Sequence, residues 1–260
     1  DLFHSDDKVE VTTHAELHSG GAYTDASARI TAILDSSTFT SKNELAKAFQ
    51  FDSYENEVTT QQLFQKIDKV GDKGELSLDF SAGKPKIVFG KLMVESAVAD
   101  DRGKYVSGQA HADYIGVDRL VGWKSTEWVY SVGKPANIQY IVVDEHGNPI
   151  KGTKVGVAAE YKVTKAARVK GAGNAYLSEY HTEWESAGKC EGTSANDALT
   201  CTFTPTKSGT YRIVAKIKDT KGNDHATTLN TYVTGNDYVV WDDENDSSLT
   251  IVPQSTDYKV

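Results

Sequence analysis

The chain has 260 residues, of which 37 are acidic and 28 are basic, so its formal net charge is −9. Binding to a phosphate backbone needs clustered Lys and Arg, whereas the densest basic stretch, residues 162–170, holds only four of them. No segment contains a run of about 18 uncharged apolar residues, as a membrane-spanning helix requires. The sequence therefore excludes nucleic-acid binding and a membrane span, and its length suits one or two domains.

Alternation of apolar and polar residues is the dominant pattern along the chain. It occurs at residues 9–13, 28–33, 75–80 and 211–217, with Gly, Asn and Asp in the segments between. A period of two residues is typical of strands with one buried face, and such turn residues join antiparallel strands. The sequence therefore predicts an all-β fold of tandem immunoglobulin-like, antiparallel β-sandwiches.

Two segments in the first half of the chain have helical rather than strand spacing. Ser41 and Glu44 match the Ser-x-x-Glu pattern of a capping box, and apolar residues follow at helical spacing: Leu45, Ala48 and Phe49. Residues 61–70 would place three apolar side chains on one face of a helical turn: Leu63, Phe64 and Ile67. We therefore expect a short helix over residues 41–51 and a helical turn over 61–70.

An internal repeat divides the chain into two units. Residues 94–103 and 213–222 align at a constant offset of 119 positions (213 minus 94), and both contain an Asp-x-x-Gly turn. Asp144–Gly147 is a third copy of this turn, in which Asp accepts backbone hydrogen bonds and Gly supplies the positive φ. The offset is close to the size of one immunoglobulin-like domain. We expect sandwiches at residues 1–118 and 119–245, and a linker with the first strand of a truncated next domain at 246–260.

The two cysteines, Cys190 and Cys201, lie 11 positions apart and flank a stretch rich in Gly, Ser, Thr and Asn that predicts a hairpin loop. The spacing favours a disulfide over two free thiols, and a bridge that closes so short a loop stabilises by about 3 kcal/mol at most. A disulfide implies an oxidising compartment, such as the bacterial periplasm or the extracellular space. Zinc is disfavoured because no His stands at ligand spacing to complete the site.

No catalytic, cofactor-binding or metal site is predicted. Nucleophile-elbow, His-Glu-x-x-His and P-loop motifs are absent from the sequence. His14 and His18 would suit a metal only on a helix, but residues 10–17 alternate like a strand. Residues 171–174 resemble part of a phosphate loop without its third Gly. Acidic residues near the C-terminus lack EF-hand spacing and favour a solvated linker over a calcium site: Asp237, Asp242, Asp243, Glu244 and Asp246.

Several stretches resemble bacterial alpha-2-macroglobulins, most specifically residues 166–177 (AARVKGAGNAYL). Further matching stretches follow the family's order along the chain: residues 94–104, 112–114, 118–122, the pair Cys190 and Cys201, and residues 203–205, 209–213 and 238–241. The resemblance implies two consecutive macroglobulin-like domains, about the fifth and sixth of a longer chain. It also implies a periplasmic protein anchored by an N-terminal lipid.

Members of this family trap proteases: cleavage of a bait region triggers a rearrangement, and a Cys–Gln thioester captures the attacking protease. The Cys-x-Glu-Gln sequence of a thioester is absent here. The resemblance therefore implies a non-enzymatic, monomeric scaffold segment without cofactors. Its partners would be the neighbouring macroglobulin, bait-region and thioester domains of the same chain and, through the full-length protein, target proteases.

Two other classes of function remain open at this point. Exposed aromatic residues would suit an extracellular adhesin or a carbohydrate-binding pair of sandwiches: Trp123, Trp128, Trp184 and Trp241. A hydrolytic site between the sandwiches would use His111 or His181 with nearby carboxylates.

Overall fold

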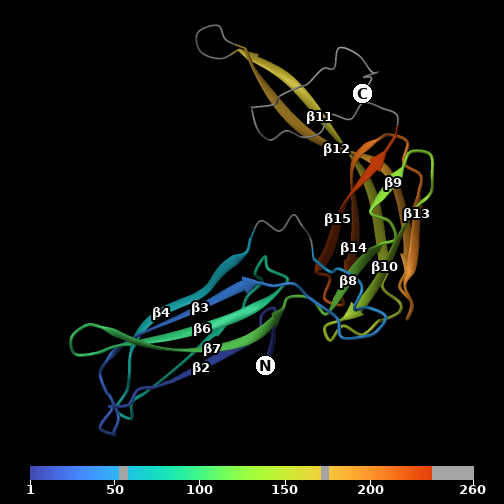
Figure 1. The fold of residues 1–260 in the computed structure, drawn as a ribbon. Helices are drawn as coiled ribbons and strands as arrows, with labels where there is room; N and C mark the ends of the chain where they lie inside the picture. Colours follow the sequence, from blue (N-terminus) through green and yellow to red (C-terminus); the bar gives the residue numbers. More distant parts are fainter. Residues whose placement is uncertain (53–57, 171–175, 236–260) are drawn as a thin grey trace, which may run out of the picture.

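The computed structural model describes the backbone of residues 1–52, 58–170 and 176–235, and the side chains of residues 1–52, 58–165 and 181–235. Every element in these residues is a β-strand, from β1 to β15, and none is a helix (Figure 1). No helix in this part of the chain has the length and hydropathy needed to cross a membrane. The predicted all-β class is confirmed.

The first sandwich consists of a five-stranded sheet in the order β1-β7-β6-β3-β4, which faces the two-stranded sheet β2-β5. Its strands are β1 (Leu2–His4), β2 (Lys8–His14), β3 (Ser27–Ser36), β4 (Thr60–Lys69), β5 (Glu75–Ser81), β6 (Phe89–Ala99) and β7 (Tyr105–Ile115). Alternate residues of β3 are buried, among them Ile30 and Leu34, and they pack with Phe80 and Leu92 in the core. The period of two in the sequence thus produces the buried face of the sheet.

The second sandwich pairs the three-stranded sheet β13-β10-β8 with the five-stranded sheet β12-β11-β14-β15-β9. Its strands are β8 (Arg119–Ser125), β9 (Val129–Ser131), β10 (Ala136–Asp144), β11 (Lys154–Lys170), β12 (Tyr176–Thr193), β13 (Leu199–Phe203), β14 (Gly209–Lys218) and β15 (Asp224–Thr234). Val121, Ile138 and Tyr211 are fully buried between the sheets. Beyond Tyr161, where pairing with β14 ends, β11 and β12 continue as a hairpin that extends past the sandwich (Figure 1).

The three Asp-x-x-Gly turns have the same hydrogen-bond geometry, as the repeat predicted. In the β6–β7 turn the Asp100 carboxylate accepts the N–H groups of Arg102 at 2.9 Å and Lys104 at 2.7 Å, and Gly103 has φ 76°. The carboxylates of Asp144 and Asp219 accept the N–H groups two and four residues ahead in the same way. The sequence motif therefore fixes this turn without help from distant residues.

The helix expected over residues 41–51 was wrong: this segment forms turns and no helix. Lys47 N–H donates to Asn43 O at 2.8 Å, which closes one helix-like turn, but the next bond runs from Phe49 N–H to Ala46 O. The Ser41 hydroxyl accepts the N–H of Asn43 at 3.0 Å, as an N-cap residue does, and also donates to the carbonyl of Gly147 in the second sandwich. The segment therefore keeps a cap-like hydrogen bond but forms only one helix-like turn.

The helical turn expected over residues 61–70 was also wrong, because these residues form strand β4. The register of β4 against β3 shifts between Ala32 and Ile33, which pair with Phe64 and Gln62, so Leu63 is an extra residue at a β-bulge. The bulge directs both Leu63 and Phe64 toward the core, whereas Ile67 stays 62% exposed. Because Leu63 and Phe64 are adjacent and both face inward, the apolar residues of β4 do not alternate, and their spacing resembles that of a helix.

Candidate functional site

The two sandwiches meet through a segment that belongs to the first by sequence and packs on the second. This junction segment, residues 37–52, connects β3 to β4. Figure 1 shows it in blue, running from the first sandwich to the end of the second near β8. Phe39 packs edge to face on two rings, with centroids 5.3 Å apart for Phe51 of the same segment and 5.1 Å apart for Phe89 of β6. The junction thus has an apolar centre of its own.

Residues from both sandwiches complete this centre. The junction segment contributes Phe39, Ala46, Phe49 and Phe51, and the remaining members of the buried cluster are Ile115, Val117, Leu120, Ile141 and Val143. Phe51 is only 2% exposed. Full burial of a large aromatic side chain is worth about 2–3 kcal/mol, so the cluster holds the sandwiches together by the same effect that stabilises a domain core.

Phe51 fits against a strand position that has no side chain. A Cβ atom at Gly122 of β8 would lie 2.6 Å from the Phe51 ring, so any larger residue would displace it. Next to this contact the backbones of Gln50 and Trp123 exchange two hydrogen bonds, of 3.0 and 2.9 Å. The junction segment therefore adds one bridge to the edge strand β8 and places Phe51 over Gly122.

Polar contacts tie the first sandwich to the third Asp-x-x-Gly turn. Ser41 Oγ donates to Gly147 O at 2.6 Å, and His4 Nε2 lies 2.7 Å from the Glu145 carboxylate. The carboxylate of Asp7 lies 3.3 Å from His4 Nδ1, on the other side of the ring. Hydrogen bonds within the Asp-x-x-Gly turn thus fix its shape. The Gly147 carbonyl and the Glu145 carboxylate of the same turn bind side chains of the first sandwich.

His225 of β15 is buried beside the same contact. Its Nδ1 accepts the N–H of Val121 at 3.1 Å, so the proton of the neutral ring is on Nε2. Thr227 next along the inner face donates its hydroxyl to Val121 O at 2.5 Å and to Phe51 O at 3.2 Å. Burial lowers the pKa of His225 to about 4, although a hydrogen bond to the Phe51 backbone acts in the opposite direction. The junction therefore requires a neutral imidazole.

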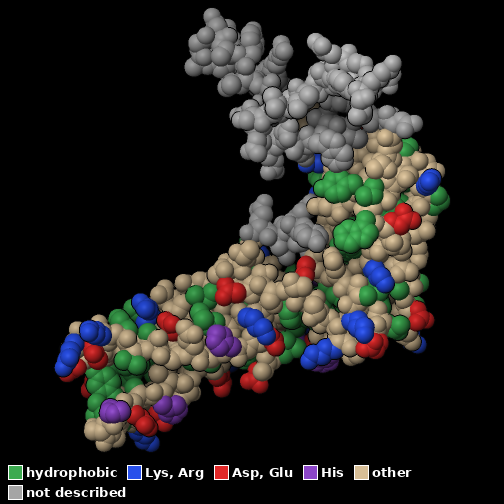
Figure 2. Space-filling model, in the orientation of Figure 1, with side chains coloured by type: hydrophobic (Ala, Val, Ile, Leu, Met, Phe, Trp, Pro, Cys, Tyr) green, Lys and Arg blue, Asp and Glu red, His purple; other side chains and the backbone are tan. Residues whose placement is uncertain are grey.

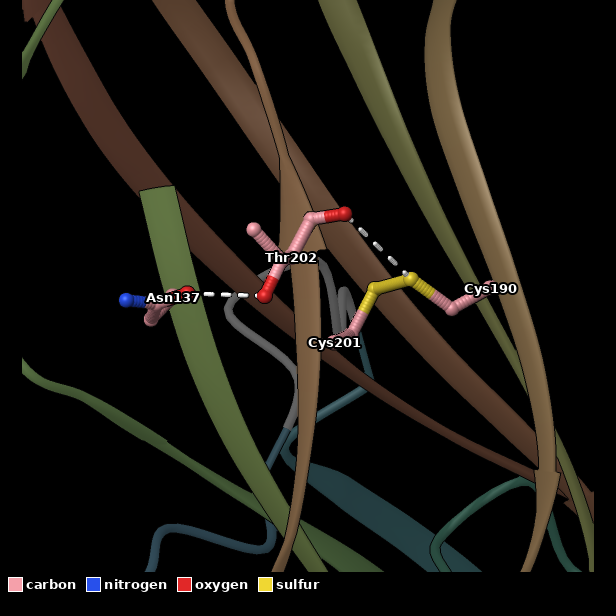
Figure 3. Close-up of a disulfide and its surroundings, with 4 residues drawn as sticks. All are labelled: Asn137, Cys190, Cys201 and Thr202. Carbon is pink, nitrogen blue, oxygen red and sulfur yellow. Dashed lines mark hydrogen bonds between the residues drawn. A yellow bond between two sulfur atoms is a disulfide. The ribbon is translucent and has the colours of Figure 1, made fainter. Parts of the chain in front are cut away.

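Cys190 and Cys201 form a disulfide with a Cα–Cα distance of 5.8 Å (Figure 3). The sequence predicted that they flank a hairpin loop, but the structure places them on edge strands of different sheets, β12 and β13. Figure 3 also shows the Thr202 hydroxyl, which donates to the Asn137 side chain of β10 at 2.7 Å. The disulfide therefore links the two sheets of the second sandwich at one edge.

Reduction of this disulfide is expected to lower the free energy of unfolding by about 2 kcal/mol, because it releases a short loop in the unfolded chain and frees one edge of the sandwich. Urea unfolding with and without reductant measures the difference. A double variant, Cys190→Ala with Cys201→Ala, serves as the control because its stability should not respond to reductant. Free thiols detected by mass spectrometry after periplasmic expression would contradict the bridge.

The histidines considered from the sequence do not gather into one site, although His14 and His18 line the same groove of the first sandwich. His14 at the end of β2 lies 3.5 Å from Glu75, and His18 follows in an exposed turn. His111 is on β7 of the first sandwich, whereas His181 is on β12 of the second. Among the described residues no group of three or more His, Cys, Asp or Glu side chains could hold a metal ion. Residues 171–174 and the acidic residues from Asp237 to Asp246 lie outside the described part of the chain.

The three tryptophans in the described part of the chain do not form a shared surface. Trp123 is buried in the second core, and the guanidinium of Arg212 covers Trp184 at 4.3 Å from its ring. Trp128 is 98% exposed in the turn between β8 and β9. Trp241 lies outside the described residues. The arrangement expected of a carbohydrate-binding face, with several exposed aromatic side chains side by side, is therefore not favoured.

The junction was not foreseen from the sequence, although two signals for it exist. Three of the eight Phe residues fall within residues 39–51, which do not alternate like a strand. Gly122 stands within the apolar run of a strand at residues 120–123, which often marks a close approach by another backbone or ring. Neither signal predicts that Phe51 contacts Gly122, because 71 positions separate the two residues (122 minus 51).

No known protein-family model matches the chain. Among curated proteins, the alpha-2-macroglobulin homolog of Nostoc sp. is 26% identical over 166 residues, which are 64% of this chain and 9% of the relative. The matched region therefore spans only a small part of that relative.

Three solved structures of bacterial alpha-2-macroglobulins share the fold. The native conformation of the E. coli protein matches 97% of this chain with a TM-score of 0.62 and 13% identity, over 16% of its own length. The Salmonella protein reacted with methylamine matches 89% with a TM-score of 0.61 and 11% identity, over 16% of its length. The E. coli protein activated by porcine elastase matches 92% with a TM-score of 0.61 and 12% identity, over 21% of that chain.

The chain therefore consists of macroglobulin-like β-sandwiches, and its resemblance to the bacterial alpha-2-macroglobulin family is confirmed.

Proposed function

We propose that the chain is a scaffold segment of a bacterial alpha-2-macroglobulin, a broad-spectrum inhibitor that traps proteases. In this proposal residues 1–118 and 119–245 are consecutive macroglobulin-like domains, about the fifth and sixth, and residues 246–260 lead into the next domain. The segment is monomeric and has no catalytic activity. Its partners are the other macroglobulin, bait-region and thioester domains of the same chain and, through them, target proteases. The likeness to the Nostoc, E. coli and Salmonella proteins supports this role.

The junction is the observation that carries the scaffold role. Domains joined only by a linker move independently unless their interface is large and hydrophobic. Here the interface contains a buried aromatic cluster, a backbone bridge to β8 and the Ser41–Gly147 hydrogen bond. The two sandwiches therefore move as one body, which would transmit a displacement from one neighbouring domain to the next after the bait region is cut.

The arrangement of the two sandwiches agrees with that role. Both the native and the elastase-activated E. coli structures match more than nine-tenths of this chain, with TM-scores of 0.62 and 0.61. A match over both sandwiches at once depends on their relative placement as well as on each fold. The two sandwiches therefore have a similar relative placement in those two E. coli structures.

A periplasmic location, with an N-terminal lipid anchor on the full-length protein, is part of the same proposal. The disulfide supports an oxidising compartment, because such bridges form and persist outside the reducing cytosol. In the periplasm the full-length protein would protect the cell from proteases of a host or a competitor.

The function is tested by comparing the full-length protein with residues 1–260 in a protease-capture assay. The full-length protein is expected to form a covalent conjugate with elastase or trypsin and to block cleavage of a large protein substrate. Residues 1–260 alone should do neither, since they lack the Cys-x-Glu-Gln thioester sequence.

Two outcomes would contradict the proposal. Inhibition or covalent capture by residues 1–260 alone would show that the segment is not a passive scaffold. Failure of the full-length protein to capture either protease would remove the protease-trapping role.

A further inference from the structure

The end of the first sandwich farthest from the junction contains an open groove of about 580 Å³. It lies between strand β2 and the hairpin of β6 and β7. Figure 2 shows hydrophobic side chains at this end of the molecule, with histidine and charged side chains around them. The volume is within the range of about 300–1,000 Å³ that is usual for ligand sites.

The floor of the groove is the uncovered inner face of β7. Val94, Ser96 and Val98 of β6 pair with Ala110, Gly108 and Val106 of β7, in that order. Paired residues of neighbouring strands point to the same side of a sheet. Val94 belongs to the core, so its partner residues on β7 also face inward, yet Val106 is 70% exposed. The sheet β2-β5 therefore leaves β7 uncovered.

One wall of the groove is the free edge of β2. Thr13 Oγ1 donates to Ser96 Oγ at 2.8 Å, which places β2 above β6 and beside the bare face of β7. In its sheet β2 has β5 on one side and, among the described residues, no strand on the other. Edge strands present unpaired N–H and C=O groups, and a groove beside such an edge is the geometry used to add a peptide strand.

The floor residues leave room for the side chains of an added strand. A Cβ atom at Gly108 would meet no atom within 4 Å, and its neighbours on that face, Val106 and Ala110, are small. Facing sheets are about 10 Å apart, so small side chains on the floor leave a gap that side chains from the opposite layer can fill. One additional strand would enlarge the two-stranded sheet to three strands and cover β7.

The charge of the lining favours a basic occupant. Glu16, Asp100 and Asp101 line the groove, and none of its described lining residues is Lys or Arg. A second copy of this chain, with a net charge of −9, is electrostatically disfavoured there. The second sandwich cannot supply the added strand, because it lies beyond the junction, at the other end of the molecule (Figure 1).

We propose that this groove binds an extended segment of a separate, basic polypeptide by adding it as a strand to the free edge of β2. Small apolar side chains at alternate positions of the segment would face Val106, Gly108 and Ala110, and a Lys or Arg would approach the carboxylates at the rim. This binding surface is distinct from the protease-trapping role and does not depend on it.

The probe is a synthetic peptide of about seven residues, with Val at alternate positions, Thr between them and Lys at both ends. Binding is followed by fluorescence anisotropy and by hydrogen exchange at the β2 amides. We expect saturable 1:1 binding that slows exchange along β2. The same peptide N-methylated at alternate residues should not bind, because it lacks the N–H donors that a new strand must supply.

Two matched substitutions locate the site. Gly108→Val fills the groove and is expected to weaken binding by at least about tenfold. Gly156→Val on β11 is the control, because a Cβ at either glycine meets nothing within 4 Å and neither has a positive φ. Val suits a strand, so both variants should fold, which circular dichroism checks.

Three results would overturn the proposal. The first is no binding of the unmethylated peptide to the folded protein, and the second is equal binding by the N-methylated peptide or by the Gly108→Val variant. The third is concentration-dependent dimerisation that Gly108→Val abolishes, which would make a second copy of this chain the occupant.

Discussion

Phe51→Ala is expected to lower the free energy of unfolding by about 3–5 kcal/mol and to uncouple the two sandwiches. The Phe51 ring packs against Phe39 and over Gly122, so truncation leaves a cavity at the centre of the junction and removes the contact that both sandwiches share. Urea unfolding followed by circular dichroism should change from one cooperative transition to two. Small-angle scattering should show a broader range of interdomain distances.

A matched control separates stability from coupling. Phe80→Ala removes the same side chain from the core of the first sandwich, where Phe80 is also buried. It should destabilise that sandwich without changing the scattering profile of the folded protein. Gly122→Ala disturbs the same contact from β8, since its Cβ would fall 2.6 Å from the Phe51 ring. It should broaden the range of interdomain distances as Phe51→Ala does.

If Phe51→Ala retains a single transition and an unchanged scattering profile, the junction does not couple the sandwiches. The scaffold role would then lose the observation on which it rests.

Lowering the pH from 6.5 to about 4 is expected to destabilise the fold by about 3 kcal/mol through His225. The pKa of this residue is about 4 in the folded protein and near 6.5 when exposed, so the unfolded chain takes up the proton first. Its contribution is complete above pH 6.5 and is lost as the pH falls toward 4. Protonation would place a proton on Nδ1 opposite the Val121 N–H and a charge in an apolar site.

The half-buried carboxyl of Asp52 acts in the opposite direction. Burial raises the pKa of Asp52, so proton uptake by this group favours the folded state as the pH falls and offsets part of the His225 effect. Urea unfolding at pH 7 and pH 4.5 measures the combined effect of His225 and Asp52 on the free energy of unfolding. His225→Gln should flatten the dependence, because a Gln side chain does not titrate there.

His146→Gln is the control for the pH experiment, since His146 lies in an exposed turn beside Glu145 and should leave the wild-type dependence intact. If His225→Gln retains the full loss of stability at low pH, another group is responsible and the role of His225 is disproved.

Patterns that depend on neighbouring residues were read correctly from the sequence. Alternation predicted the strands β2, β3, β5 and β14, because a residue's face on a strand follows from its position alone. The Asp-x-x-Gly turns were equally predictable, since each carboxylate bonds to N–H groups two and four residues ahead. The fold class could be predicted because it is the sum of such local preferences.

Residues 41–51 and 61–70 show where local patterns mislead. A capping-box sequence is compatible with both a helix and a turn. The contact that distinguishes them here joins the Ser41 hydroxyl to the Gly147 carbonyl, 106 positions away. The bulge at Leu63 arises from register with β3, which the sequence of β4 does not encode by itself. In both places a distant contact decides between alternatives that are close in local free energy.

By itself, the sequence determined the alternating strands β2, β3, β5 and β14, the three repeated turns and the paired cysteines, because each depends on residues within about ten positions. Only the tertiary structure decided how the sandwiches are joined, which sheets the disulfide links and which edge of β2 has no neighbouring strand among the described residues. The Thr227 hydroxyl bonds to the Phe51 carbonyl across 176 positions, and no local pattern specifies such a pair. The junction and the groove therefore exist only once the sheets have packed.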